Sequence, residues 1–151
     1  MSAGDRFLQK CLDTTIEHDP WPHQILHDTF DDTTFEKLRN VSITKLAHIT
    51  TDKLIHIHPT EYEDYGINFY DETLDICDKL YHNLKNITSK FPECRHFENL
   101  GVNAHVSITP PLPFKFYIHQ EGLEKIWSSV TYISPTENVG TKMYTAQSED
   151  A

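Results

Sequence analysis

The stretch FKFYIHQEGLEKIWSSVTYISP, residues 114–135, alternates apolar and polar side chains from its first residue. Because successive side chains of a strand point to opposite faces, this alternation predicts a β-strand with one apolar and one polar face. The apolar face would carry Phe114, Phe116 and Ile118. Tyr117 and His119 would share the polar face, and Glu121 joins them if the extended backbone continues through Gln120.

Further strands are predicted on both sides of this stretch, while helices are predicted before it. The segments GVNAHVSIT (101–109), IWSSVTYIS (126–134) and TKMYT (141–145) have strand character. Helices are expected at about 5–12, 33–39 and 71–87, with a short strand near 24–28 and one or two more between 46 and 57. Helices followed by strands favour an α+β fold with a helical layer on one side of a sheet.

The strongest helical pattern covers residues 71–87. Its apolar residues recur every three or four positions, which predicts one buried stripe. The stripe consists of Leu74, Cys77, Leu80, Tyr81, Leu84 and Ile87. We expect it to pack on the sheet formed after residue 99. At 151 residues the chain is expected to form a single domain, 1–151, with a helix-rich part at 1–98.

The composition disfavours several classes of partner. A net charge of −10 opposes attraction to nucleic acid and to anionic membranes, so neither partner is expected. The N-terminal residues lack the basic-then-apolar layout of a signal peptide, which predicts an intracellular, cytoplasmic protein. The three cysteines show no C-x-x-C spacing and are interpreted as reduced thiols.

His119 and Glu121 are the candidate metal ligands. On one strand face, an H-x-[DE] pair can offer an imidazole nitrogen and a carboxylate oxygen to the same metal ion. With a second histidine, such a pair forms the facial triad of non-haem iron(II) oxygenases. The motif is short, and the ten histidines of this chain make it easy to meet by chance. A polar strand end followed by a turn therefore stays open as the alternative.

Four segments resemble the iron(II)- and 2-oxoglutarate-dependent oxygenases, in particular the small prolyl-hydroxylase-like members of marine phages and bacteria. They are DPWPHQILHDTFDDTTFEKL (19–38), FYIHQE (116–121), LEKIWSSVTYISP (123–135) and ENVGTKMY (137–144). The resemblance covers roughly residues 20–145. It implies a double-stranded β-helix, or jelly roll, whose first strands occupy 99–151 behind a layer of N-terminal helices. A virus-encoded origin is compatible with it.

The resemblance implies roles for three residues. His119 would be the first iron ligand and Glu121 the carboxylate ligand, although aspartate is commoner there in the family. Tyr117 would lie beside the cosubstrate 2-oxoglutarate. No histidine follows His119, and the last basic residue is Lys142, so the family's second histidine and its cosubstrate anchor are not found. We therefore expect a truncated or split jelly roll without its C-terminal half, and assign no catalytic residue; the substrate is unknown.

Other candidate sites are weaker. His56-Ile-His58 has metal-like spacing, but exposed histidines beside Pro59 are the simpler interpretation. Cys94-Arg-His96 would need an orienting third group to act as a nucleophile. His105 could supply a missing ligand, although a strand histidine without that role is the simpler expectation.

Open sheet edges predict self-association. A jelly roll that stops halfway leaves unpaired backbone groups, which invite strand addition from another copy. We therefore expect a homo-oligomer that forms through about residues 126–145. Two alternatives to an active oxygenase stay open. One is a degenerate, non-catalytic jelly-roll module with a binding or structural role, and the other is an unrelated small α+β protein.

Overall fold

The structure is a computed structural model that describes residues 1–19, 21–92, 99–110, 125 and 127–133. Within these ranges it contains four α-helices, three short 3₁₀-helices and two strands. The α-helices are α1 (Ala3–Asp13), α2 (Asp32–Thr44), α3 (Tyr70–His82) and α4 (Leu84–Thr88). The 3₁₀-helices are η1 (Leu46–His48), η2 (Pro59–Glu61) and η3 (Glu63–Tyr65), and the strands are β1 (Ile55–Ile57) and β2 (Val106–Ile108).

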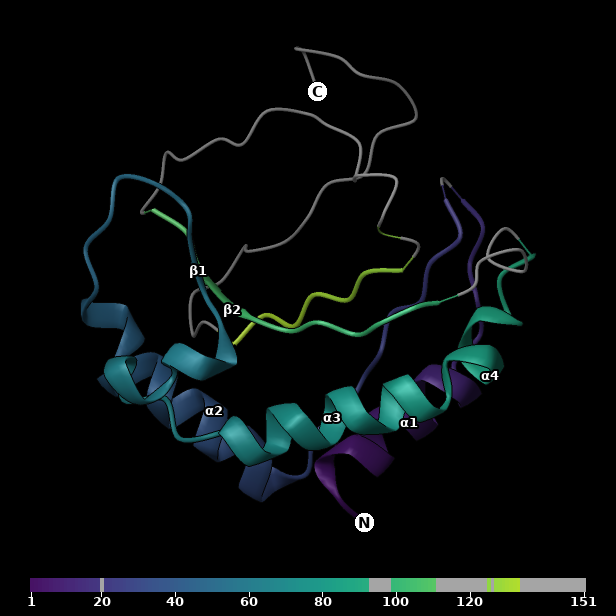
Figure 1. Cartoon of the computed structure of the whole chain (residues 1–151), viewed down its shortest axis with the longest axis horizontal. Helices are drawn as coiled ribbons and strands as arrows, with labels where there is room; N and C mark the ends of the chain where they lie inside the picture. The colour runs from purple at the N-terminus through teal and green to yellow at the C-terminus, as the bar shows by residue number, and fades with distance from the viewer. Residues whose placement is uncertain (20, 93–98, 111–124, 126, 134–151) are drawn as a thin grey trace.

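Helices and strands form two layers. The helices line one side of the molecule, and the β1–β2 ribbon crosses above them with the segment 127–133 (Figure 1). β1 and β2 pair antiparallel, and they form a two-stranded sheet in the described part of the chain. The predicted α+β class is confirmed at this level, with every described helix within the first 88 residues. The jelly roll stays a prediction.

The starts of α1 and α2 follow from short polar side chains that cap them. Ser2 precedes α1 and forms a capping box with Asp5, in which each side chain bonds the backbone N–H of the other residue. Asp31 precedes α2 and accepts a hydrogen bond of 2.7 Å from the backbone N–H of Thr34. These caps satisfy N–H groups that have no partner inside the helix.

Polar contacts join α1 to α3 at close range. The backbone N–H of Gly4 donates to Asp75 Oδ2 at 2.6 Å. A Cβ at position 4 would overlap the Asp75 backbone, lying 2.7 Å from its carbonyl carbon, so only glycine fits here. Lys79 Nζ lies 3.1 Å from Asp5 Oδ1 one turn further along. The two helices therefore approach closely because glycine and paired charges form their contact.

The C-terminal end of α1 is held by a lysine from the end of the helical layer. Lys90 Nζ donates to the carbonyl oxygens of Cys11, Leu12 and Thr14 at 3.1, 2.5 and 3.0 Å. The carbonyls at a helix C-terminus lack intrahelical partners and carry partial negative charge. The ammonium group of Lys90 meets both needs, and it fixes the chain after α4 against α1.

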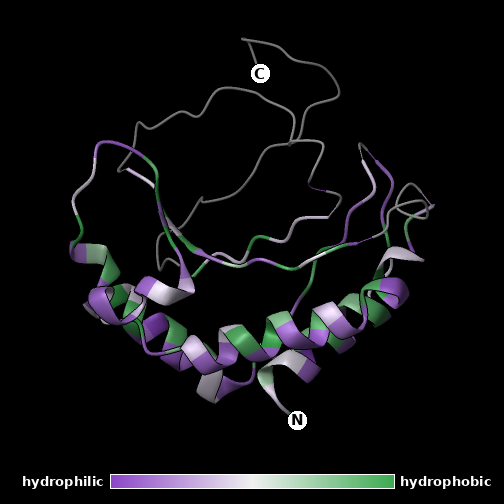
Figure 2. Cartoon of the chain, in the orientation of Figure 1, coloured by the Kyte–Doolittle hydropathy of each residue, from purple (hydrophilic) through white to green (hydrophobic). Residues whose placement is uncertain are grey.

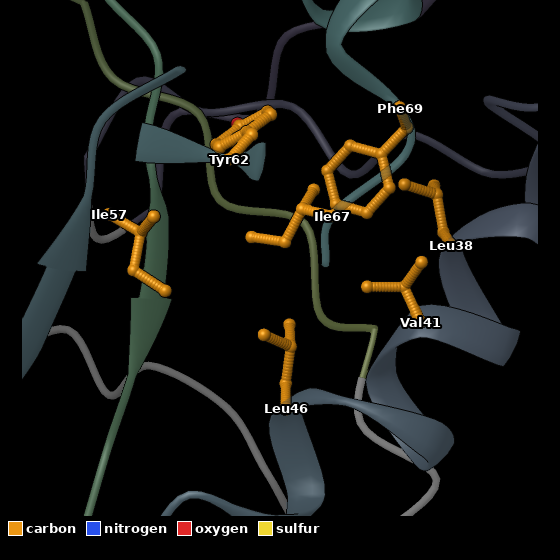
Figure 3. Packing of buried hydrophobic residues seen from close by; sticks show 7 residues of the cluster. All are labelled: Leu38, Val41, Leu46, Ile57, Tyr62, Ile67 and Phe69. Carbon is orange, nitrogen blue, oxygen red and sulfur yellow. The ribbon is translucent and has the colours of Figure 1, made fainter. Parts of the chain in front are cut away.

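Two hydrophobic clusters lie between the layers. Cluster 1 joins α2, η1, β1 and the chain before α3 through Leu38, Val41, Leu46, Ile57, Tyr62, Ile67 and Phe69, which point toward a common centre (Figure 3). Cluster 2 joins α1 to α3 and α4 through Phe7, Cys11, Leu80 and Ile87. Phe30 packs against both clusters, so the two are continuous. Each fully buried aliphatic or aromatic side chain contributes about 1.5–3 kcal/mol.

The helix predicted at 71–87 is divided at Asn83 into α3 and α4. The predicted stripe is correct for Leu80 and Ile87, which are buried, and wrong for Leu74 and Tyr81, which are 44% and 54% exposed. Among the described residues α3 packs mainly on α1. Val102 and Trp127, which follow residue 99, pack against the cluster that contains Leu80 and Ile87. The face of α3 that contacts α1 includes Asp75 and Lys79. Their polar contacts with α1 rotate the buried face of α3 away from the stripe that the apolar periodicity predicts. Figure 2 shows that hydrophilic and hydrophobic residues are interspersed along these helices.

Several predicted strands are shorter than expected or are not strands. Residues 24–28 form no strand, and 101–109 are extended into a strand only at Val106–Ile108. The described residues 127–133 have no strand pairing, although 126–134 was predicted as a strand. The stretch 114–119 and the segment 141–145 lie outside the described residues. Self-association through 126–145 and the single-domain prediction remain predictions.

Candidate metal-binding residues

The residues predicted to bind iron, His119 and Glu121, lie outside the described residues, as does Tyr117. Cys94 and His96 also lie outside them. The described residues that follow the motif cross both hydrophobic clusters. Trp127 packs against cluster 2, and Ile133 packs against cluster 1. Trp127 and Ile133 thus attach the segment 127–133 to the helical layer, while Val130 and Tyr132 of the same segment are exposed.

The β1–β2 ribbon has two faces of different character. Its register is Ile55 opposite Ile108, His56 opposite Ser107, and Ile57 opposite Val106. The four aliphatic side chains belong to cluster 1 or pack against it, while His56 and Ser107 are exposed. A one-residue slip would expose the aliphatic side chains and turn the polar ones inward, so burial fixes which side chains face outward. His105, one residue before β2, is exposed as well.

His56 and His105 lie against each other on the outer face. Their ring centroids are 4.5 Å apart, and the rings meet edge to face at 78°. The Nδ1 of His56 is hydrogen-bonded to Ser107 Oγ at 2.9 Å. Partial burial lowers the pKa of His105 from 6.5, and the nearby charges of His56, Lys125 and His58 lower that pKa further. His105 is thereby biased toward its neutral form.

His58 follows β1 and has a structural role. Its Nδ1 accepts a hydrogen bond of 3.4 Å from the backbone N–H of Thr60 and lies 2.9 Å from Thr60 Oγ1. Its own backbone N–H donates to Glu61 Oε2 at 3.0 Å. These bonds form a capping box at the start of η2. The Nδ1 lone pair of His58 is therefore occupied, and its ring anchors the turn beside Pro59.

The described thiols are poorly suited to nucleophilic chemistry. Cys11 and Cys77 are free cysteines, as predicted. Burial in cluster 2 raises the pKa of Cys11 to about 11, although the charge of Lys90 opposes this rise. Burial also raises the pKa of Cys77. Since the thiolate is the reactive form, both residues act as apolar packing groups here.

A pocket of about 320 Å³ opens between the start of α2 and the segment 131–133. It is lined by Asp28, Thr29, Phe30, Asp32, Phe35, Thr131, Tyr132 and Ile133. The lining mixes acids with half-exposed aromatic rings, and the described residues among it include no histidine or cysteine.

The described residues contain no convergent group of three or more His, Cys, Asp or Glu side chains that could hold a metal ion. They also contain no helix that is long and apolar enough to cross a membrane. Comparisons with protein families, with curated proteins and with solved structures gave no match.

The sequence predicts that His56 and His105 both lie in extended segments, but it does not predict that they lie next to each other. The alternation in IHI and in HVSI indicates that each of the two histidines lies on the strand face opposite to that of the neighbouring isoleucine or valine. The pairing register between segments about fifty residues apart has no signal in a single sequence. The aliphatic residues common to both strands were the one available hint, because their shared burial sets the register.

Proposed function

We propose that this chain is related to the iron(II)- and 2-oxoglutarate-dependent oxygenases of the hydroxylase type. The observation that carries the proposal is the H-x-E pair of the sequence, His119 and Glu121, at positions that the alternation predicts to share the polar face of a strand. The order of the four resembling segments supports it. The helical layer with strands above it is compatible with a jelly roll that carries N-terminal helices (Figure 1).

The donor set fits iron(II) in kind. An imidazole nitrogen and a carboxylate oxygen are two of the three ligands in a facial triad. His119 and Glu121 would hold the metal, and Tyr117 would lie beside 2-oxoglutarate. When bound, iron and 2-oxoglutarate together supply the oxidation of a C–H bond by dioxygen. Two protein ligands hold a metal weakly, and a cosubstrate without an anchoring cation is poorly positioned for reaction.

A second candidate is a degenerate jelly-roll module that binds or supports a partner without catalysis. The sequence feature that favours it is the lack of any histidine after His119, with Lys142 the only basic residue after Lys125. The retained H-x-E pair favours the first candidate. Measurements of metal binding and of 2-oxoglutarate turnover distinguish the oxygenase from the non-catalytic module.

The test is an anaerobic titration of the full chain with iron(II), in which calorimetry measures the binding. We expect a weak binding component that is lost in both His119→Ala and Glu121→Ala, while any iron bound elsewhere and the far-ultraviolet circular dichroism stay unchanged. His18→Ala and Asp19→Ala are matched controls, because they remove an adjacent histidine and acid that are both exposed. Equal binding by wild type and both site variants would reduce the motif to a polar turn and refute the proposed iron site.

A turnover assay separates the active and the degenerate forms. Conversion of 2-oxoglutarate to succinate by the isolated chain should be undetectable, because the third ligand and the carboxylate anchor are not found. Iron-dependent turnover above the His119→Ala background would exclude the degenerate module and show that another residue completes the site.

A further inference from the structure

We propose that His56 and His105 form a two-imidazole binding site for a divalent transition-metal ion such as Zn²⁺ on the exposed face of the β1–β2 ribbon. The site is separate from His119 and Glu121 and does not depend on the oxygenase proposal. It uses the arrangement of the ribbon, in which β1 carries His56 and the residue just before β2 is His105.

The distance between the rings suits a shared metal ion. Zinc–imidazole bonds of about 2.0–2.1 Å place two ligand nitrogens of a tetrahedral site roughly 3.3 Å apart. Ring centroids at 4.5 Å allow two ring nitrogens to reach that separation by side-chain rotation. Both side chains are exposed, so water can complete the coordination.

Ser107 supports His56 as a ligand. A metal-bound histidine usually directs its other ring nitrogen to a hydrogen-bonding group, which fixes the ring and its tautomer. The bond of 2.9 Å between Nδ1 of His56 and Ser107 Oγ has this geometry. When Nδ1–H donates to the hydroxyl, Nε2 of His56 carries the lone pair that can bind a metal. Ser107 is therefore a positioning residue.

The charges around the pair bear on its affinity for a cation. Lys125 and His58 lie close enough to His105 to act on it electrostatically. The positive charge of Lys125 also opposes a bound cation, so we expect modest affinity.

Two other uses of these residues are less well supported. A serine nucleophile at Ser107 would need His56 as a base and an acid that orients His56. The group against the His56 ring is instead His105, which cannot stabilise an imidazolium. His58 does not offer a third ligand in this arrangement. Its Nδ1 accepts a hydrogen bond from the Thr60 N–H, so the proton of the neutral ring is on Nε2, which then has no lone pair for a metal. A two-histidine site is what the contacts allow.

The experiment uses the full chain carrying His119→Ala and Glu121→Ala, so that the proposed iron site contributes nothing. ZnCl₂ is added at neutral pH, and the histidine ring signals are followed by NMR alongside calorimetry. We expect one zinc ion per chain and parallel shifts of the His56 and His105 signals. MgCl₂ should cause no shift, because magnesium prefers oxygen ligands. Shifts of other histidines instead of this pair would overturn the proposal.

Variants in the same background test each role. His56→Ala and His105→Ala should each weaken zinc binding by more than the roughly 10- to 100-fold that loss of an outer hydrogen-bond partner costs. Ser107→Ala should weaken binding less than either. The distant His48→Ala is the matched control and should retain the affinity. Undiminished binding in either His56→Ala or His105→Ala would overturn the site.

Discussion

Gly4 of α1 lies directly against the backbone of Asp75 in α3, and its N–H donates to the carboxylate of the same residue at 2.6 Å. Asp75 of α3 thus contacts the start of α1 with both its main chain and its side chain. This contact sets how closely the two helices approach, and it bears the first prediction.

Replacing Gly4 by alanine should destabilise the protein by about 1–3 kcal/mol, because the added methyl group forces the two helices apart. Urea unfolding followed by circular dichroism measures the change in the free energy of unfolding. Gly101→Ala is the matched control, since no atom lies within 4 Å of a Cβ at that position. Equal stabilities for Gly4→Ala and wild type would show that α1 and α3 do not pack as described.

Replacing Lys90 by methionine keeps much of the aliphatic side chain and removes the ammonium group. The carbonyls of Cys11, Leu12 and Thr14 would lose a charged donor, at a cost of about 1–3 kcal/mol. Thermal and urea unfolding would measure the loss. Lys85→Met, at an exposed position of α4, should change the free energy of unfolding by less than about 0.5 kcal/mol. A Lys90→Met protein as stable as wild type would contradict the cap.

Asp31 should make the stability of α2 depend on pH. Hydrogen bonds from the Thr34 backbone and side chain hold the pKa of Asp31 below 3.8. A lowered pKa in the folded state gives stability that is present above the pKa of the unfolded chain and is lost as pH falls through the folded value. Asp31→Asn keeps an acceptor that does not titrate, so its stability should depend less on pH in acid than that of wild type.

At neutral pH the same position tests the cap itself. Asp31→Ala should be less stable than Asp31→Asn, because alanine offers no acceptor to the Thr34 N–H. Asp52→Ala, in an exposed loop, is the control and should match wild type. Unfolding curves for all four proteins give the comparison. Identical curves for the alanine and asparagine variants would show that Asp31 does not cap α2.

His105 should titrate below 6.5 in an NMR experiment, because burial and neighbouring positive charge disfavour its protonated form. His56→Gln should raise the pKa of His105 by removing one of those charges, and His48→Gln should leave that pKa unchanged. Since the pKa is lowered in the folded state, the contribution of His105 to stability is present above 6.5 and is lost as pH falls through the folded value. A pKa above 6.5 would contradict the proximity of the two rings.

The local parts of the fold could be read from the sequence. The helix expected at about 33–39 is confirmed within α2, whose start depends on a local cap by Asp31 three residues before Thr34. His56 and His58 were correctly expected to be exposed beside Pro59. The exposure of Leu74 could not be read, because the face that α3 buries depends on Gly4 and Asp5 of a helix about seventy residues earlier. Tertiary polar contacts of this kind leave no periodic signal.

The candidate sites also differ in whether a local sequence pattern indicates them. H-x-E is a local motif that the sequence shows directly, whereas the contact of His56 with His105 depends on strand register. Ser107 had no signal at all, since a serine on a strand face is ordinary until a histidine ring is placed opposite it.

The hydrogen bonds from Lys90 to the C-terminal end of α1 have a consequence for folding during synthesis on the ribosome. The first helix emerges early, yet its packing partners in α3 and its closing lysine are made about sixty to eighty residues later. During that interval the apolar side of α1 with Phe7 and Cys11 has no partner, and chaperones that recognise exposed apolar segments can bind it. We expect nascent chains that end before residue 90 to be digested by protease within α1, and longer chains to resist, so pulsed proteolysis of stalled nascent chains would locate the point at which the helical layer closes.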